Sequence, residues 1–146
     1  MSESIITSQL AVAAEDLSHA RQGLEQTLGY LREQGQPWAL SGLHSIVEDP
    51  YVIGKIGDLQ IRLEVAAALH ERAAALTGQP EQRLIASSEA VIASADALQA
   101  VGNIQQELTG QRPALPSQAG REPLRWHYQI IGNYRLNGVV PPQLQE

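Results

Sequence analysis

His19 is the first side chain in the sequence that suggests chemistry, because it follows Glu15 and Asp16 by four and three residues. A carboxylate and a histidine one helical turn apart share a helix face and form one part of a di-iron carboxylate site. Such a site also needs a second pair of this kind and two further inward carboxylates. The sequence contains no second pair, so we interpret His19 as part of a solvated helix face and predict no metal site.

The other candidate catalytic groups are also incomplete. His70 precedes Glu71, but no second histidine completes the zinc-protease pattern H-E-x-x-H. His44 lies near acidic residues, in a segment that we interpret as a loop with an exposed histidine. Ser87 and Ser88 have no His or Asp that the sequence places beside them, and the chain contains no cysteine nucleophile. Since no phosphate loop or G-x-S-x-G elbow is present either, we predict no catalytic residue.

The C-terminal segment RWHYQIIGNYRLNG interleaves aromatic and basic side chains. Trp126, Tyr128 and Tyr134 alternate with Arg125 and His127, a composition suited to stacking on a planar ligand. An equally good interpretation is that these amphipathic rings anchor a short helix to the rest of the protein. The sequence leaves both alternatives open.

The composition limits the classes of binding partner and the cellular compartment that we expect. A net charge of −6, spread along the chain, argues against nucleic acid as a partner. The first residues, MSESIITSQL, lack the basic and apolar regions of a signal peptide, and no apolar run reaches the ~20 residues of a membrane span. The absence of cysteine agrees with a reducing compartment. We therefore expect a cytoplasmic protein without a membrane partner.

The predicted elements are all helices. In the first, expected over residues 4–34, leucines recur every seven residues with alanines between them, which indicates a seam for another helix. The seam consists of Leu10, Ala13, Leu17, Ala20, Leu24, Leu28 and Leu31. Gly23 and Gly29 should weaken this helix, by up to ~1 kcal/mol each. A Leu-Ala stripe that remains exposed would favour self-association through Leu10, Leu17 and Leu24 or a neighbouring face.

Three further helices follow, over residues 50–76, 81–108 and 123–134. Asp49 and Pro50 are suited to the N-cap and the first position of the second helix. The last helix should place Leu124, Tyr128 and Ile131 on its packing side. Residues 1–146 therefore predict a single all-α domain, an antiparallel up-and-down four-helix bundle with a short last helix.

Three segments resemble the C-terminal helical domain of the acyl-CoA dehydrogenase fold, most closely that of flavin-dependent monooxygenases of the sulfur-acquisition and dibenzothiophene type. DLSHARQGLEQTLGYLREQGQPWALSG is similar to the first bundle helix and its Arg-Pro-Trp loop. EDPYVIGKIGDLQIRLEVAAALHERAA is similar to an Asp-Pro-Tyr helix, and REPLRWHYQIIGNYRLNGVVPP to the Trp-Lys-Tyr, Ile-Gly and Leu-Asn-Gly-x-x-Pro-Pro ending. The resemblance covers the chain from about residue 8 onward.

The resemblance implies a bundle that forms the core of a dimer or tetramer and supplies part of a flavin and substrate pocket. The cofactor would be FMN, reduced by a separate reductase, with FAD as the alternative known from the dehydrogenase branch. We expect the N-terminal and β-barrel flavin domains of the family to be absent from these residues. They would then have to be provided in trans.

Several positions depart from the family pattern. Gln34 and Gln36 stand near the place of an arginine suited to a flavin phosphate, and a neutral amide does not replace a guanidinium there. Arg121 and Glu122 stand where relatives carry the His-Asp pair, and His127 falls at a lysine of the family. The catalytic glutamate of acyl-CoA dehydrogenases has no counterpart.

The cofactor-binding residues that the resemblance implies are Trp38, Arg121, Trp126 and Tyr128, which match or flank the family's pocket motifs. We therefore expect the C-terminal bundle of a flavin-dependent oxidoreductase, inactive by itself, that serves as an oligomerisation core and as part of the pocket. The alternative is a stand-alone, non-catalytic bundle for self-association or partner binding.

Overall fold

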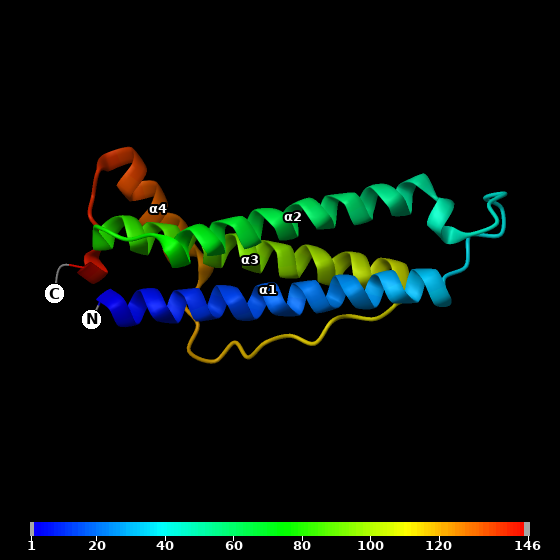
Figure 1. Cartoon of the computed structure of the whole chain (residues 1–146), viewed down its shortest axis with the longest axis horizontal. Coiled ribbons are helices and arrows are strands. Elements are labelled where there is room, and N and C mark those ends of the chain that lie inside the picture. Colours follow the sequence, from blue (N-terminus) through cyan, green and yellow to red (C-terminus); the bar gives the residue numbers. More distant parts are fainter. Residues whose placement is uncertain (1, 145–146) are drawn as a thin grey trace.

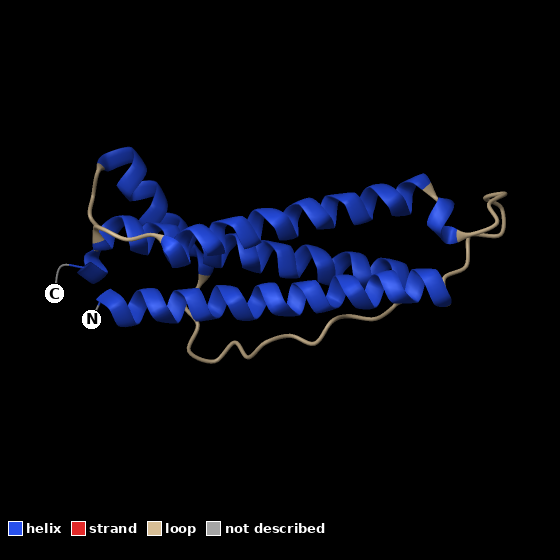
Figure 2. Cartoon of the chain, in the orientation of Figure 1, coloured by secondary structure: helices blue, strands red, loops and turns tan. Residues whose placement is uncertain are grey.

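The computed structural model describes residues 2–144, and every regular element in this part of the chain is a helix (Figure 2). Three long helices lie side by side and alternate in direction, and a shorter helix stands at one end (Figure 1). The four helices are α1 (Ser2–Glu33), α2 (Pro50–Ala75), α3 (Pro80–Thr109) and α4 (Leu124–Asn137). Two one-turn 3-10 helices, η1 (Ile46–Glu48) and η2 (Pro142–Leu144), complete the fold. The predicted all-α class is confirmed.

The helix ends follow local signals. Asp49 is the N-cap of α2, and its carboxylate accepts a hydrogen bond from the backbone N–H of Tyr51 at 2.9 Å, while Pro50 occupies the first turn. Gly110 and Gly138 end α3 and α4 in the left-handed conformation, with φ of 78° and 68°. Because Gly138 rather than Tyr134 sets this end, α4 extends three residues beyond the predicted 134.

The core lies along α3, which packs against both α1 and α2. The predicted seam of α1 is buried there at its central positions, including Ala13, Leu17, Ala20 and Leu24. Leu17 and Leu24 pack in the same cluster as Leu59 of α2. The proposed self-association through Leu17 and Leu24 is therefore wrong, because the chain's own helices already cover these side chains.

α3 is the one helix within residues 2–144 that is long and apolar enough to cross a membrane, with a mean hydropathy of 1.3 over 18 residues. Of this window, 56% is buried inside the protein. The buried residues of α3 include Ser87, Ser88, Ser94 and Gln105, which are polar. The apolar composition of α3 is accounted for by its place at the centre of the bundle.

Gly23 allows α1 and α3 to approach closely. A Cβ atom at this position would lie 2.7 Å from Cγ1 of Val101 and 3.2 Å from Cβ of Pro113. A Cβ at Gly29 would meet nothing within 4 Å. At Gly23, unlike Gly29, the absent side chain also makes room for α3 and for the segment that follows it.

Residues 110–123, here called the return connection, run back along α1 and bring α4 to the end of the bundle where α1 begins (Figure 1). Pro113 and Pro116 of this connection are buried. α4 then packs on α3 through His127 and Ile130, its two buried residues. Leu124 and Tyr128, predicted on the packing side, are exposed, so the face of α4 that packs on the bundle differs from the predicted one. The error arose because the buried face carries a histidine where an apolar residue was expected.

Candidate functional site

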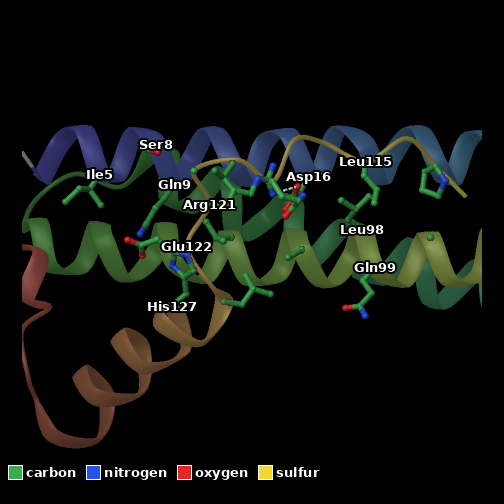
Figure 3. A pocket seen from close by; sticks show the side chains of 18 of the residues that line it. Ile5, Ser8, Gln9, Asp16, Leu98, Gln99, Leu115, Arg121, Glu122 and His127 are labelled. Carbon is green, nitrogen blue, oxygen red and sulfur yellow. Dashed lines mark hydrogen bonds and ion pairs between the residues drawn. The ribbon is translucent and has the colours of Figure 1, made fainter.

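A cavity of about 640 Å³ opens between α1, α3, the return connection and the start of α4 (Figure 3). Its walls combine apolar side chains with about as many polar and charged ones. The apolar part includes Ile5, Val12, Leu98, Leu115 and Leu124. The polar part includes Gln9, Asp16, Arg112, Arg121, Glu122 and His127.

Arg121 joins the return connection to α1. Its Nη1 donates to Oδ1 of Asp16 at 2.7 Å (Figure 3). Its Nη2 lies 3.2 Å from Oε2 of Glu15. The Asp16 side chain is only 3% exposed and that of Arg121 13%, so water screens this pair weakly. Two carboxylates already neutralise the guanidinium. Arg121 therefore holds the cavity wall in place and is not a free cation for an anionic ligand.

His127 lies in the first turn of α4 and is 5% exposed. Among the described residues, nothing forms a hydrogen bond with its buried Nδ1 atom. Burial lowers the pKa of His127 below its ordinary value of 6.5, and the negative charge of Glu122 opposes this shift only in part. The imidazole is therefore neutral near pH 7, with one ring nitrogen as donor and the other as acceptor.

Gln9 connects the cavity to the core of α3. Its Oε1 accepts hydrogen bonds from the hydroxyls of Ser87 and Ser88, both of which are fully buried. The two serines are therefore not helix-face residues, as the sequence suggested, but fix the orientation of a side chain that lines the cavity. Figure 3 shows Gln9, Glu122 and His127 toward one end of the cavity, and Leu115 and Gln99 toward the other.

Arg112 is a second cation in the cavity wall. Its Nε donates to Oε1 of Gln106 at 2.6 Å, and its Nη2 to Oδ1 of Asn103 at 3.3 Å. Both partners are neutral amides, so the charge of Arg112 is not cancelled by a carboxylate contact, in contrast to that of Arg121. Of the two arginines, Arg112 is the one that can bind an anionic group.

The four residues implied by the resemblance do not form one cluster within this chain. Arg121 lines the cavity, whereas Trp126 and Tyr128 lie on α4 with 43% and 59% of their surface exposed. The guanidinium of Arg125 stacks over the Trp126 ring at 4.8 Å from its centroid. Trp38 is 72% exposed and belongs to the connection between α1 and α2, at the opposite end of the bundle from α4 (Figure 1).

Sequence reasoning missed the residues that give the cavity its polarity. Gln9 and Arg112 carried no motif, Asp16 was weighed only beside His19, and His127 was considered only beside aromatic rings and at the place of a family lysine. The spacing of His127, Ile130 and Tyr134 by three or four residues does place them on one helix face, so this signal was present in the sequence. Among residues 2–144, no three His, Asp or Glu side chains gather as a metal site would require.

The helical arrangement agrees with the comparisons with known proteins. Residues 1–129 match the family of the acyl-CoA dehydrogenase C-terminal domain. The chain therefore belongs to this family, as the three sequence segments indicated.

Among individual proteins, the chain is similar to dibenzothiophene monooxygenases. It is 30% identical to the enzyme of Mycolicibacterium goodii over 158 residues, which cover 91% of this chain and 38% of the relative. A relative from Rhodococcus erythropolis is 27% identical and covers 92% of this chain. The chain thus spans about two fifths of the length of the curated relatives it matches.

The solved structures of TdsC, a dibenzothiophene monooxygenase from Paenibacillus sp. A11-2, share the fold. The complex of TdsC with FMN and indole superposes with a TM-score of 0.80 at 22% identity, over 93% of this chain and 40% of TdsC. Another TdsC structure gives a TM-score of 0.77 at 25% identity. This likeness confirms the bundle architecture.

Proposed function

We propose that this chain supplies the C-terminal bundle of a flavin-dependent monooxygenase, where it forms an oligomerisation core and one wall of the flavin and substrate pocket. The observation that carries the proposal is the cavity of about 640 Å³, which is lined almost entirely by the segment that matches the family. The similar TdsC was crystallised with FMN, which supports FMN as the cofactor. The remaining walls would come from domains outside these residues.

The lining suits FMN in part. Arg112 offers a cation for a phosphate, and the apolar walls offer contacts for a planar ring. Arg121 does not suit a phosphate, because Asp16 and Glu15 occupy its guanidinium. Trp126 and Tyr128 offer exposed ring faces beside the site, and Trp38 could act only from another copy or another domain.

Bound reduced flavin would supply the electrons that activate oxygen, and a reductase in trans would regenerate it. The cavity residues of this chain would bind and orient the ligand and exclude water, and among residues 2–144 we assign no general acid or base. We therefore propose that the purified chain has no turnover alone. Flavin-dependent oxygenation by the purified chain would contradict this.

A second candidate is a non-catalytic bundle for self-association, and a specific surface favours it. α2 exposes Ile53, Ile61 and Val65, with 55%, 65% and 50% of their surfaces accessible, along one side of the helix. The four-residue spacings from Ile53 through Gly57 to Ile61 and Val65 form a stripe that is suited to a second helix. We propose that this stripe replaces the buried α1 seam as the self-association surface.

Native mass spectrometry with and without excess FMN tests both candidates. An oligomer that takes up FMN, and loses it on Arg112→Gln but not on the surface change Arg125→Gln, supports the flavin proposal. An oligomer that excludes FMN supports the second candidate. If Ile61→Glu leaves the native mass unchanged, the α2 stripe is not the interface. We expect the protein to be cytoplasmic in either case.

A further inference from the structure

We propose that α4 is an acid-sensitive flap on the cavity, which stays docked on α3 while the buried ring of His127 is uncharged and is released when that ring gains a proton. Release would open the wall that α4 contributes to the cavity. The inference goes beyond the proposed function, because it concerns how α4 is attached and holds whatever molecule occupies the cavity.

The attachment of α4 to the bundle is small. Of its 14 residues, His127 and Ile130 are the two that are buried, and α4 packs on α3. In α3, by comparison, 12 of 30 residues are buried. One of the two buried side chains of α4 is therefore titratable, and a single protonation acts directly on what holds this helix in place.

The environment of the His127 ring suits the neutral imidazole and not the imidazolium. Its Nδ1 atom is buried and forms no hydrogen bond with any described residue. A neutral ring can leave this nitrogen as an acceptor, whereas in the charged ring both nitrogens carry an N–H that needs a partner. A buried charge without a partner is costly, and release of α4 into water removes that cost. The lowered pKa of His127 has the same cause, burial.

The acidic groups near His127 do little to compensate for an added proton. Glu122 of the return connection lies beside the ring (Figure 3), and its attraction for the imidazolium is smaller than the cost of burial. The side chain of Glu122 is itself exposed, so water screens this attraction. Asp16 and Glu15 of α1 are already paired with Arg121.

The other elements at the cavity add positive charge or none. α4 itself carries Arg125 and Arg135 and no carboxylate. The second cation of the wall, Arg112, contacts neutral amides. The part of α3 that lines the cavity has no titratable side chain, since it consists of Val91, Ala95, Leu98, Gln99 and Gly102. Among residues 2–144, a proton on His127 therefore finds no acidic partner that could keep it buried.

α4 can leave α3 and return, because the chain is anchored on both sides of this helix. Before it, Arg121 donates to Asp16 at 2.7 Å. After it, Pro141 is fully buried. A helix of 14 residues is only marginally stable in water by itself, so released α4 would also lose internal hydrogen bonds. Hydrogen exchange of the α4 amides therefore reports its release.

Hydrogen–deuterium exchange of the whole chain at about pH 7.5 and about pH 5.5 tests the proposal, after correction for the intrinsic pH dependence of exchange. This interval spans the ordinary pKa of histidine, about 6.5, and stays above that of carboxyl groups. One pH unit below 6.5 shifts the equilibrium toward release by up to about tenfold. We expect the protection of α4 to fall about five- to tenfold, and that of residues 84–101 in α3 to fall less than about twofold.

Three variants assign the effect to the ring. His127→Leu keeps an apolar side chain at the contact and removes the titrating group, so the protection of α4 should be the same at both pH values. His44→Leu, at an exposed histidine in the distant connection, is the matched control and should respond as the wild type does. Glu122→Gln removes the opposing attraction, so the fall in protection should be at least as large as in the wild type.

Three results would overturn the proposal. Equal protection of α4 at both pH values in the wild type would show that the helix is not released. A fall that α3 shares would mean that the whole bundle loosens, and a fall that persists in His127→Leu would assign the proton to another group. If circular dichroism shows that His127→Leu does not fold, the comparison of α4 with α3 in the wild type and in Glu122→Gln decides. None of these results depends on FMN uptake.

Discussion

Replacement of Gly23 by alanine should destabilise the protein, although alanine is the better helix former. The new Cβ would lie 2.7 Å from Val101 Cγ1, 3.2 Å from Gln105 Oε1 and 3.2 Å from Pro113 Cβ. Val101 is fully buried and β-branched, so it cannot move aside easily. Overpacking of a core costs ~1–3 kcal/mol, and these rigid neighbours place Gly23→Ala in the upper part of that range. Higher helix propensity offsets up to ~1 kcal/mol, leaving a net loss of about 1–2 kcal/mol.

Urea denaturation followed by circular dichroism measures this loss. Thermal denaturation should show a fall in melting temperature of ~2–8 °C, at ~2–4 °C per kcal/mol. Gly29→Ala is the matched control in the same helix. Its Cβ would meet nothing within 4 Å, so it should gain up to ~1 kcal/mol from helix propensity alone. The two variants should therefore shift the unfolding midpoint in opposite directions.

The reasoning would be refuted if Gly23→Ala were as stable as the wild type or more stable. That result would mean that α3 and the return connection yield by several tenths of an ångström at little cost. A loss in both variants would instead point to a requirement for glycine in α1 that close packing does not explain.

Three further predictions concern charge, pH and exposure. Arg121→Met should lower the free energy of unfolding, measured by urea denaturation, by about 2–3 kcal/mol, because it leaves the carboxylate of Asp16 buried without its partner. Adding Asp16→Asn should recover at least half of this loss, and no recovery would contradict the pairing. His127 should contribute stability that is fully present above pH 6.5 and lost as the pH falls from 6.5 toward its lowered folded-state pKa, because the unfolded chain then binds the proton more tightly. The difference in unfolding free energy between the wild type and His127→Leu should therefore change over this pH interval. Parallel pH curves for the two proteins would show the prediction to be wrong. Iodide should quench Trp38, which is 72% exposed, more than Trp126, which is 43% exposed; Trp38→Phe should remove the more accessible component, and equal quenching before and after would contradict this placement.

The helices could be predicted from the sequence because their signals are local. The seven-residue leucine spacing in α1 and the Asp49-Pro50 cap each depend on neighbours within one or two turns. The number and order of the helices followed from the same kind of signal, because Gly-Pro breaks separate the periodic segments. The lengths agree with the structure to within a few residues, except where Gly138 rather than Tyr134 ends α4.

The cavity could not be predicted, because its contacts join distant parts of the chain. Arg121 and Asp16 are 105 residues apart, and no pattern in either segment identifies the other as its partner. The role of Arg121 therefore changed from an expected cofactor contact to a carboxylate-bound wall residue. His127 was missed for a different reason, since a histidine between aromatic and basic residues looks like a solvated position until the docking of α4 buries it.

The return connection also sets the order in which the protein can be assembled during synthesis. α1, α2 and α3 leave the ribosome before residues 110–127, so the long helices can pair while the cavity still lacks a wall. The wall of the cavity is completed only when Arg121 reaches Asp16, across a sequence separation of 105 residues. A protease that cuts the exposed stretch at residues 117–120 would leave the three paired helices uncut. One such cut would separate α4 from the return connection, so that the cavity would lose a wall while the three long helices stay paired.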